Sequence, residues 1–187
     1  MVNRQLLTGL LLLLLGGSSH AFSAAAASQG AHVHGEATLN VVLEGNTLYI
    51  EFDSPAINLI GFEHAPNNEE QAAAFSNAKQ MLASAERLFD FSTTTCLLEN
   101  AEIEAPYMKN HEPADHQNHH EAQQEHADFH ASYIFQCEQA KDLTAISIKF
   151  FALFPGIQAI KAYWIFQGKQ GAASLTADAD NHMLTVN

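Results

Sequence analysis

Basic residues are scarce in this chain of 187 residues. It has 8 lysines and arginines against 21 aspartates and glutamates, which gives a formal net charge of −13. Such a surface repels the phosphates of nucleic acids and the headgroups of anionic membranes, so we expect neither as a partner. Cations are the natural ligands of so acidic a chain.

Short enzyme motifs are also missing. The chain contains no HExxH, no GxSxG and no glycine-rich phosphate loop. We therefore predict no catalytic residues and a protein that is not an enzyme. A metal-dependent hydrolase is the alternative, because a catalytic zinc ion needs only an open coordination position in a shaped pocket.

Long apolar runs are limited to one, at the start of the chain. Leu6–Leu15 follows Arg4 and precedes small residues around Ala21 and Ala24. This order is typical of a secretory signal peptide, and the run is short for a membrane span. We expect residues 1–21 to be the leader, with cleavage after Ala21 or after Ala24. The chain is therefore expected to be exported.

Cysteine is rare, and the two present are Cys96 and Cys137. In an exported protein the default is a disulfide between them. Its loop would enclose a histidine-rich stretch, and loop entropy would contribute about 4 kcal/mol at most. The alternative is a pair of free thiols that contribute to a metal site.

Histidine, in contrast, is abundant between Lys109 and His130, where six of the eleven histidines lie among acidic residues. Apolar side chains are almost absent there until Phe129, so most of the stretch cannot bury a core. Neutral imidazole is a common transition-metal ligand, and carboxylates add oxygen donors. We predict a metal-collecting loop over residues 109–125, with zinc as its ion. Its auxiliary ligands are His111, His116, His119 and His120.

Other metals are the alternative within the binding class. Copper or nickel storage would also use histidine, but soft Cu(I) sites favour methionine-rich tracts, and the chain has only 4 methionines. A third possibility is a structural or partner-docking protein in which the loop is a spacer.

The rest of the chain is patterned mainly for strands. Alternating apolar residues predict a β-hairpin over residues 37–53 with its turn at Gly45-Asn46. A second alternation from Phe129 and a return strand over residues 143–151 predict a second hairpin. A helix is expected from about Asn68 to Phe89.

Two proline segments predict an internal duplication. Pro55 and Pro155 are each followed two residues later by isoleucine, and isoleucine recurs at Ile60 and Ile160. The predicted fold class is α+β and β-rich, with two related β-hairpin units packed with one long helix. Residues 22–30 are expected to be a flexible N-terminus, and residues 31–187 one metal-binding domain.

A tight metal site is predicted where strands begin. Residues two apart on a strand share a face, which applies to His32 with His34 and to His126 with Asp128. The predicted ligands are His32, His34, His64, His126 and Asp128. The alternatives are a mobile pair at His32 and His34, and structural roles for His64 and for His130, which shares the face of Asp128.

Several segments resemble one family. AHVHGEATLNVVLEG, SPAINLIGFEHAP, HADFHASYIFQC and FPGIQAIKAYW, with the histidine-rich loop between them, are similar to the ZrgA family of periplasmic zinc-binding proteins. That family was formerly catalogued as a domain of unknown function. The resemblance covers nearly the whole mature chain. It implies a periplasmic protein of a Gram-negative bacterium, here expected to be a monomer, that captures Zn(II) and supports its uptake with an ABC-type importer.

Overall fold

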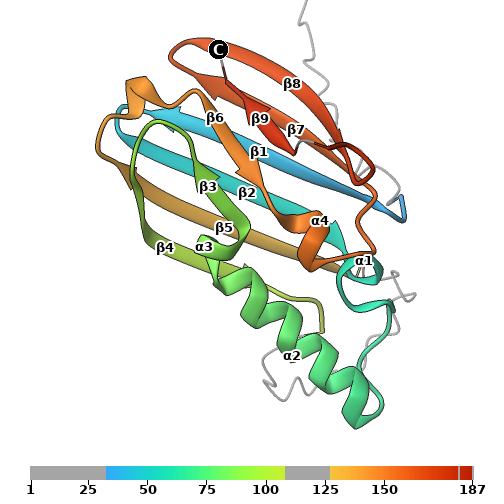
Figure 1. The fold of residues 1–187 in the computed structure, drawn as a ribbon. Helices are drawn as coiled ribbons and strands as arrows, with labels where there is room; N and C mark the ends of the chain where they lie inside the picture. The colour runs from blue at the N-terminus through green and yellow to red at the C-terminus, as the bar shows by residue number, and fades with distance from the viewer. Residues whose placement is uncertain (1–32, 108–126, 181, 187) are drawn as a thin grey trace, which may run out of the picture. The chain divides into compact units, whose positions relative to one another are not determined.

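Two β-sheets form the framework of the domain in the computed structural model, which describes residues 33–107, 127–180 and 182–186 (Figure 1). The larger sheet has the strand order β4-β5-β2-β1-β7-β8, and the smaller has the order β3-β6-β9. The larger sheet comprises β1 (Glu36–Glu44), β2 (Thr47–Pro55), β4 (Cys96–Glu104), β5 (Asp128–Cys137), β7 (Ala159–Phe166) and β8 (Lys169–Thr176). The smaller comprises β3 (Phe89–Phe91), β6 (Ala145–Ile148) and β9 (Met183–Thr185). The fold is therefore β-rich, as predicted.

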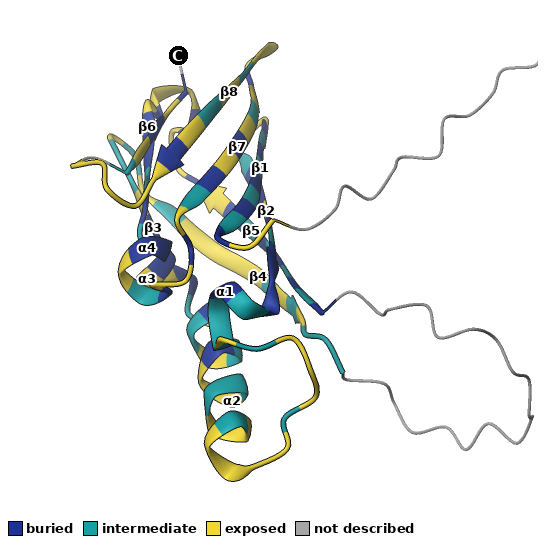
Figure 2. Cartoon of the chain, turned by 90° about the vertical axis from the view of Figure 1, so that its right-hand side faces the viewer, coloured by how far each residue is buried: buried dark blue, intermediate teal, exposed yellow. Residues whose placement is uncertain are grey.

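The central hairpin confirms the first prediction. β1 and β2 are antiparallel, with Val41 opposite Ile50, and they turn at Gly45, whose φ of +61° suits glycine. Every second residue of both strands is buried (Figure 2). β1 also pairs with β7, and this is a parallel pairing.

The core lies between the two sheets and is rich in aromatic rings. Phe52 of β2 stacks on Phe150 with ring centroids 4.2 Å apart. Phe89 of β3 meets Tyr133 and Phe135 of β5 edge to face, at 5.3 and 6.0 Å. The face of the larger sheet that carries these residues is the inner face. The opposite, outer face carries the alternate residues of each strand.

The helices are short apart from one. They are α1 (Ala56–Ile60), α2 (Glu69–Ala83), α3 (Ala85–Leu88) and α4 (Phe150–Leu153), with a 3-10 turn at Ala140–Asp142. The Asn68 side chain caps α2 by accepting a hydrogen bond from the Gln71 N–H. Among the described residues, no helix has both the length and the apolar character needed to cross a membrane.

The predicted helix over residues 68–89 ends earlier than expected. α2 stops at Ala83, and the chain bends at Ser84, which has non-helical backbone angles, before the single turn of α3. The buried Tyr133 hydroxyl donates to the Leu82 carbonyl at 2.8 Å, which ties the end of α2 to the sheet. Phe89 then begins β3 because its ring enters the core between the sheets.

The predicted second hairpin is wrong. β5 pairs with β2 and β4, whereas β6 pairs with β3 and β9 in the other sheet. The intervening turn at Ala140–Asp142 carries the chain from one sheet to the other. Alternation correctly indicated that these segments are extended, but it carries no information about which strand lies beside which. The two proline segments also differ, because Pro55 precedes α1 whereas Pro155 lies in a turn before β7.

The predicted disulfide is confirmed. Cys96 at the start of β4 is bonded to Cys137 at the end of β5, and the two residues are direct partners in the antiparallel register. β4 is an edge strand of the larger sheet, so this bond fastens it to its single neighbour.

Replacing both cysteines by alanine is expected to lower the free energy of unfolding by about 4 kcal/mol at most, because the bond closes a loop with a sequence separation of 41 residues. Urea denaturation of the double variant measures this loss. Leu97→Ala, a change at an exposed neighbour in β4, is the control and should cost far less. Equal stability of the double variant and the parent would contradict the expectation.

Candidate metal-binding site

Three chain segments meet at one end of the larger sheet. β1 begins just after His34, β2 ends at Pro55, and β5 begins at Asp128. Pro55 and Asp128 are partners in the antiparallel register, and the Ala56 N–H donates to the Ala127 carbonyl at 2.6 Å. α1 follows β2 directly and lies at this end of the sheet (Figure 1). The candidate metal site lies around these chain ends.

His34 and Glu63 form a contact at this end. The Nε2 atom of His34 lies 3.1 Å from Oε1 of Glu63, and the side chains are 62% and 39% exposed. Glu63 follows α1, which ends at Gly61 with φ +83° and a hydrogen bond from its N–H to the Ile57 carbonyl. An imidazole nitrogen and a carboxylate oxygen, both open to solvent, are a pair of donors suited to zinc.

Tyr107 lies near two of the carboxylates. It follows β4 with a φ of +65°, an uncommon conformation for an aromatic residue. Burial raises the pKa of its phenol, and the negative charges of Glu63 and Asp128 raise it further. Among the described residues, its buried hydroxyl oxygen has no hydrogen-bond partner. Tyr107 therefore stays protonated and places a hydrogen-bond donor near Glu63 and Asp128.

His64 lies one residue beyond Glu63 but makes a local contact. Its Nδ1 atom is 3.0 Å from the Ala65 carbonyl oxygen, and its ring stacks on Phe62 with centroids 5.0 Å apart. Among the described residues, neither contact joins His64 to His34 or Glu63. The remaining predicted ligands lie outside the described residues, namely His32, His126, His111, His116, His119 and His120.

Within residues 33–107, 127–180 and 182–186, no three His, Cys, Asp or Glu side chains are grouped so as to hold a metal ion. The described part of the site is the His34–Glu63 pair, with Asp128 and Tyr107 close by. Glu63 and Tyr107 are not among the ligands predicted from the sequence. The one available signal for Glu63 was a carboxylate held between a glycine and a proline in the GFEHAP segment.

His130 lies on the outer face of the larger sheet and is paired. Its Nδ1 atom is 2.6 Å from Oδ1 of Asp53, its partner in the β2–β5 register. The hydrogen bond to Asp53 raises the pKa of His130, desolvation opposes the rise, and the charges of Asp53, Glu104 and Glu51 add to it. Glu36, the first residue of β1, accepts a hydrogen bond from Lys161 Nζ at 2.5 Å.

Asp53→Asn is expected to lower the pKa of His130 toward its ordinary value of about 6.5. Because the folded-state pKa is raised, the pair stabilises the fold fully below the unfolded-state value. That contribution fades as pH rises through the folded-state value. An NMR titration of the metal-free protein follows the ring directly. Asp90→Asn, which removes the partner of Lys149, is the control and should leave the His130 titration in place. An unchanged His130 pKa in Asp53→Asn would refute this.

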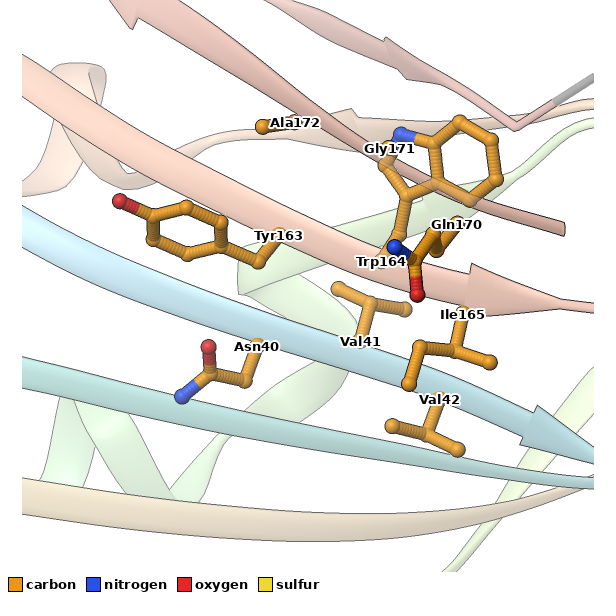
Figure 3. A pocket seen from close by; sticks show the side chains of 9 residues that line it. All are labelled: Asn40, Val41, Val42, Tyr163, Trp164, Ile165, Gln170, Gly171 and Ala172. Carbon is orange, nitrogen blue, oxygen red and sulfur yellow. The ribbon is translucent and has the colours of Figure 1, made fainter.

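A separate hollow lies over β1, β7 and β8 (Figure 3). It has a volume of about 660 Å³, and residues such as Val42, Tyr163 and Ile165 line it. No histidine, cysteine or acidic residue is among its lining residues. The hollow is therefore unsuited to a metal ion, and the candidate site remains at the end of the sheet.

Comparison with known families gives one match. A family model described as "ZrgA family zinc uptake protein" matches residues 31–184. The match includes the His34, Glu63 and Asp128 segments and both cysteines. A comparison with curated proteins finds no significant match.

Proposed function

The chain belongs to the ZrgA family of zinc uptake proteins, and from this premise we propose that it captures Zn(II) in the periplasm and supports zinc uptake. The observation that carries the proposal is the His34–Glu63 pair, with nitrogen and oxygen donors 3.1 Å apart at the end of the sheet where Asp128 begins β5. Zinc is the cargo in this proposal, and the protein has no catalytic role.

The donor set suits zinc. Imidazole nitrogen and carboxylate oxygen both bind Zn(II) at about 2.0–2.2 Å in tetrahedral sites. At 3.1 Å, His34 and Glu63 are hydrogen-bonded to each other, and an ion between them would replace that contact with two metal bonds. Asp128 begins β5 at the same end of the sheet but is not grouped with His34 and Glu63 in the metal-free structure, so its oxygen would join the site only on binding of the ion. His32, His64 and His126 are the other candidate ligands, and a tetrahedral ion would take four of the six.

Tyr107 is the proposed hydrogen-bond donor to the carboxylates of the site. Its protonated hydroxyl has no hydrogen-bond partner among the described residues, and the charges of Glu63 and Asp128 act on it, so we propose that it donates to one of these carboxylates when the ion binds. Such partners orient ligands and keep them in the charged form.

The charge of the whole chain favours capture. With a formal charge of −13, the protein attracts divalent cations over distances of about 10 Å at moderate ionic strength. The loop over residues 109–125 adds His111, His116, His119 and His120, which would bind further ions loosely. The loop collects ions, and the site at the end of the sheet holds one tightly.

The cellular setting is part of the proposal. A leader over residues 1–21 would export the chain, and the disulfide between Cys96 and Cys137 suits an oxidising compartment. We further propose that a monomer of this protein passes its ion to an ABC-type importer.

Zinc is expected to raise the melting temperature of the protein near neutral pH and to lose this effect in acid, because its ligands must be deprotonated. His34→Ala and Glu63→Gln should each weaken zinc binding by about 10-fold or more, a loss typical even of residues that only orient ligands. Isothermal titration calorimetry with zinc, copper, nickel and magnesium measures both affinity and preference.

His182→Ala is the matched control for these variants. His182 contacts the Thr176 carbonyl and the Phe151 ring rather than His34 or Glu63, so its loss should leave zinc affinity unchanged. The proposal fails if zinc neither stabilises nor binds the parent protein. A clear preference for copper or nickel would instead favour a role in storing that metal.

Deleting residues 110–125 separates collection from tight binding. The shortened protein should bind fewer zinc ions per chain while its tightest affinity stays within about 3-fold of the parent, because His34 and Glu63 remain. Calorimetric stoichiometry measures both quantities. An unchanged number of bound ions would mean that the loop is a spacer. Loss of the high-affinity binding step would mean that the tight site lies in the loop.

A further inference from the structure

One buried amide lies beneath the candidate site. Asn58 of α1 is 4% exposed, and Ser54 is the only other buried polar side chain among the described residues. A buried amide is costly unless its polar atoms are hydrogen-bonded. Oδ1 of Asn58 accepts from the Gly35 N–H at 2.7 Å, and Nδ2 donates to the Glu36 carbonyl at 2.9 Å and to Ser54 Oγ at 3.2 Å. Because a backbone N–H only donates and a carbonyl only accepts, one orientation of the amide satisfies both.

These bonds hold the chain directly after His34. The N–H of Gly35 belongs to the peptide group that contains the His34 carbonyl. The Gly35 carbonyl accepts from the N–H groups of Gln158 and Ala159, at 2.7 and 2.9 Å. The φ of Gly35 is +85°, a conformation that suits glycine. Both backbone polar groups of Gly35 are therefore bonded to other segments of the chain.

The segment that carries Asn58 also leads to Glu63. Only the end of α1 and Gly61–Phe62 separate the two residues, and Glu63 contacts the His34 ring at 3.1 Å. α1 itself is held closely, because a Cβ atom at Gly156 would lie 2.4 Å from the Asn58 carbonyl oxygen. One short segment thus contacts both the backbone beside His34 and its ring.

Packing cannot hold the His34 ring in place. The side chain of His34 is 62% exposed, and the preceding Val33 is 52% exposed. The backbone bonds of the next residue fix where the side chain of His34 starts, and Glu63 is the described residue that contacts its ring.

We propose that Asn58 is a positioning residue that sets the His34 ring against Glu63 and thereby sets the affinity for zinc. The part that concerns zinc rests on the proposed function. Asn58 does not touch the ion, and it acts by fixing the peptide that follows the ligand. A ligand held in place before the ion arrives loses less freedom on binding, which favours affinity.

A double-mutant cycle tests this. Asn58→Ala should raise the zinc dissociation constant about 10-fold, within the range for residues that orient ligands. The same change in a His34→Ala background should have almost no effect, because no ring remains to be positioned. All proteins are compared at a temperature where denaturation curves show them folded. An Asn58→Ala effect of equal size in both backgrounds overturns the proposal.

Two further measurements keep stability and function apart. Ile148→Val, a core change in the smaller sheet, destabilises the protein without touching α1 and should leave zinc affinity unchanged. In the metal-free protein, Asn58→Ala should move the His34 ring signals in NMR spectra in the same direction as Glu63→Gln does. If His34→Ala leaves zinc binding intact, the proposed metal site fails, and these ring signals alone decide the role of Asn58. Unchanged signals would overturn that role as well.

Discussion

The register of β2 between β1 and β5 is the constraint on which the rest of the structure depends. β2 is hydrogen-bonded along both sides, and its alternate residues, Ile50 and Phe52 among them, are fully buried. A slip of one residue would turn those side chains outward and bring Asp53 into the core. The same register places Pro55 opposite Asp128 and Asp53 opposite His130. The packing of the core and the position of the candidate site therefore have a common cause.

The sequence predicted those parts of the fold that are determined locally. The first hairpin has its turn signal and both alternating strands within residues 36–55, so neighbours in sequence are neighbours in space. The disulfide followed from the number of cysteines and the expected compartment. The partners of β5 and β6 did not follow, because they are chosen by packing between distant segments. Alternation predicts which face of a strand is buried but not which strand lies next to it.

The candidate site was likewise predictable from the sequence only in part. The spacing of histidine and aspartate at the start of two strands predicted ligands there, and the structure places His34 and Asp128 at the same end of the larger sheet. Their role as ligands stays a prediction. Glu63 and Tyr107 reach it through the loops after α1 and β4, whose paths no periodic pattern encodes. The role of Asn58 could not be predicted from the sequence for a different reason. It interrupts the apolar segment AINLI, and only the burial of its amide reveals that it bonds to the chain beside His34.

A structural zinc site is closed by four ligands and contributes directly to folding. The fold described here has other sources of stability, namely an aromatic core between two sheets and a disulfide at the edge of the larger one. The His34 and Glu63 side chains are well exposed at the rim of that fold rather than inside it. Under the proposed function, an ion at this rim could leave without the core being disturbed. The backbone hydrogen bonds of Gly35 would keep His34 in place while the site holds no ion. Ready release with little reorganisation is the physical requirement for a protein that passes its ion to another.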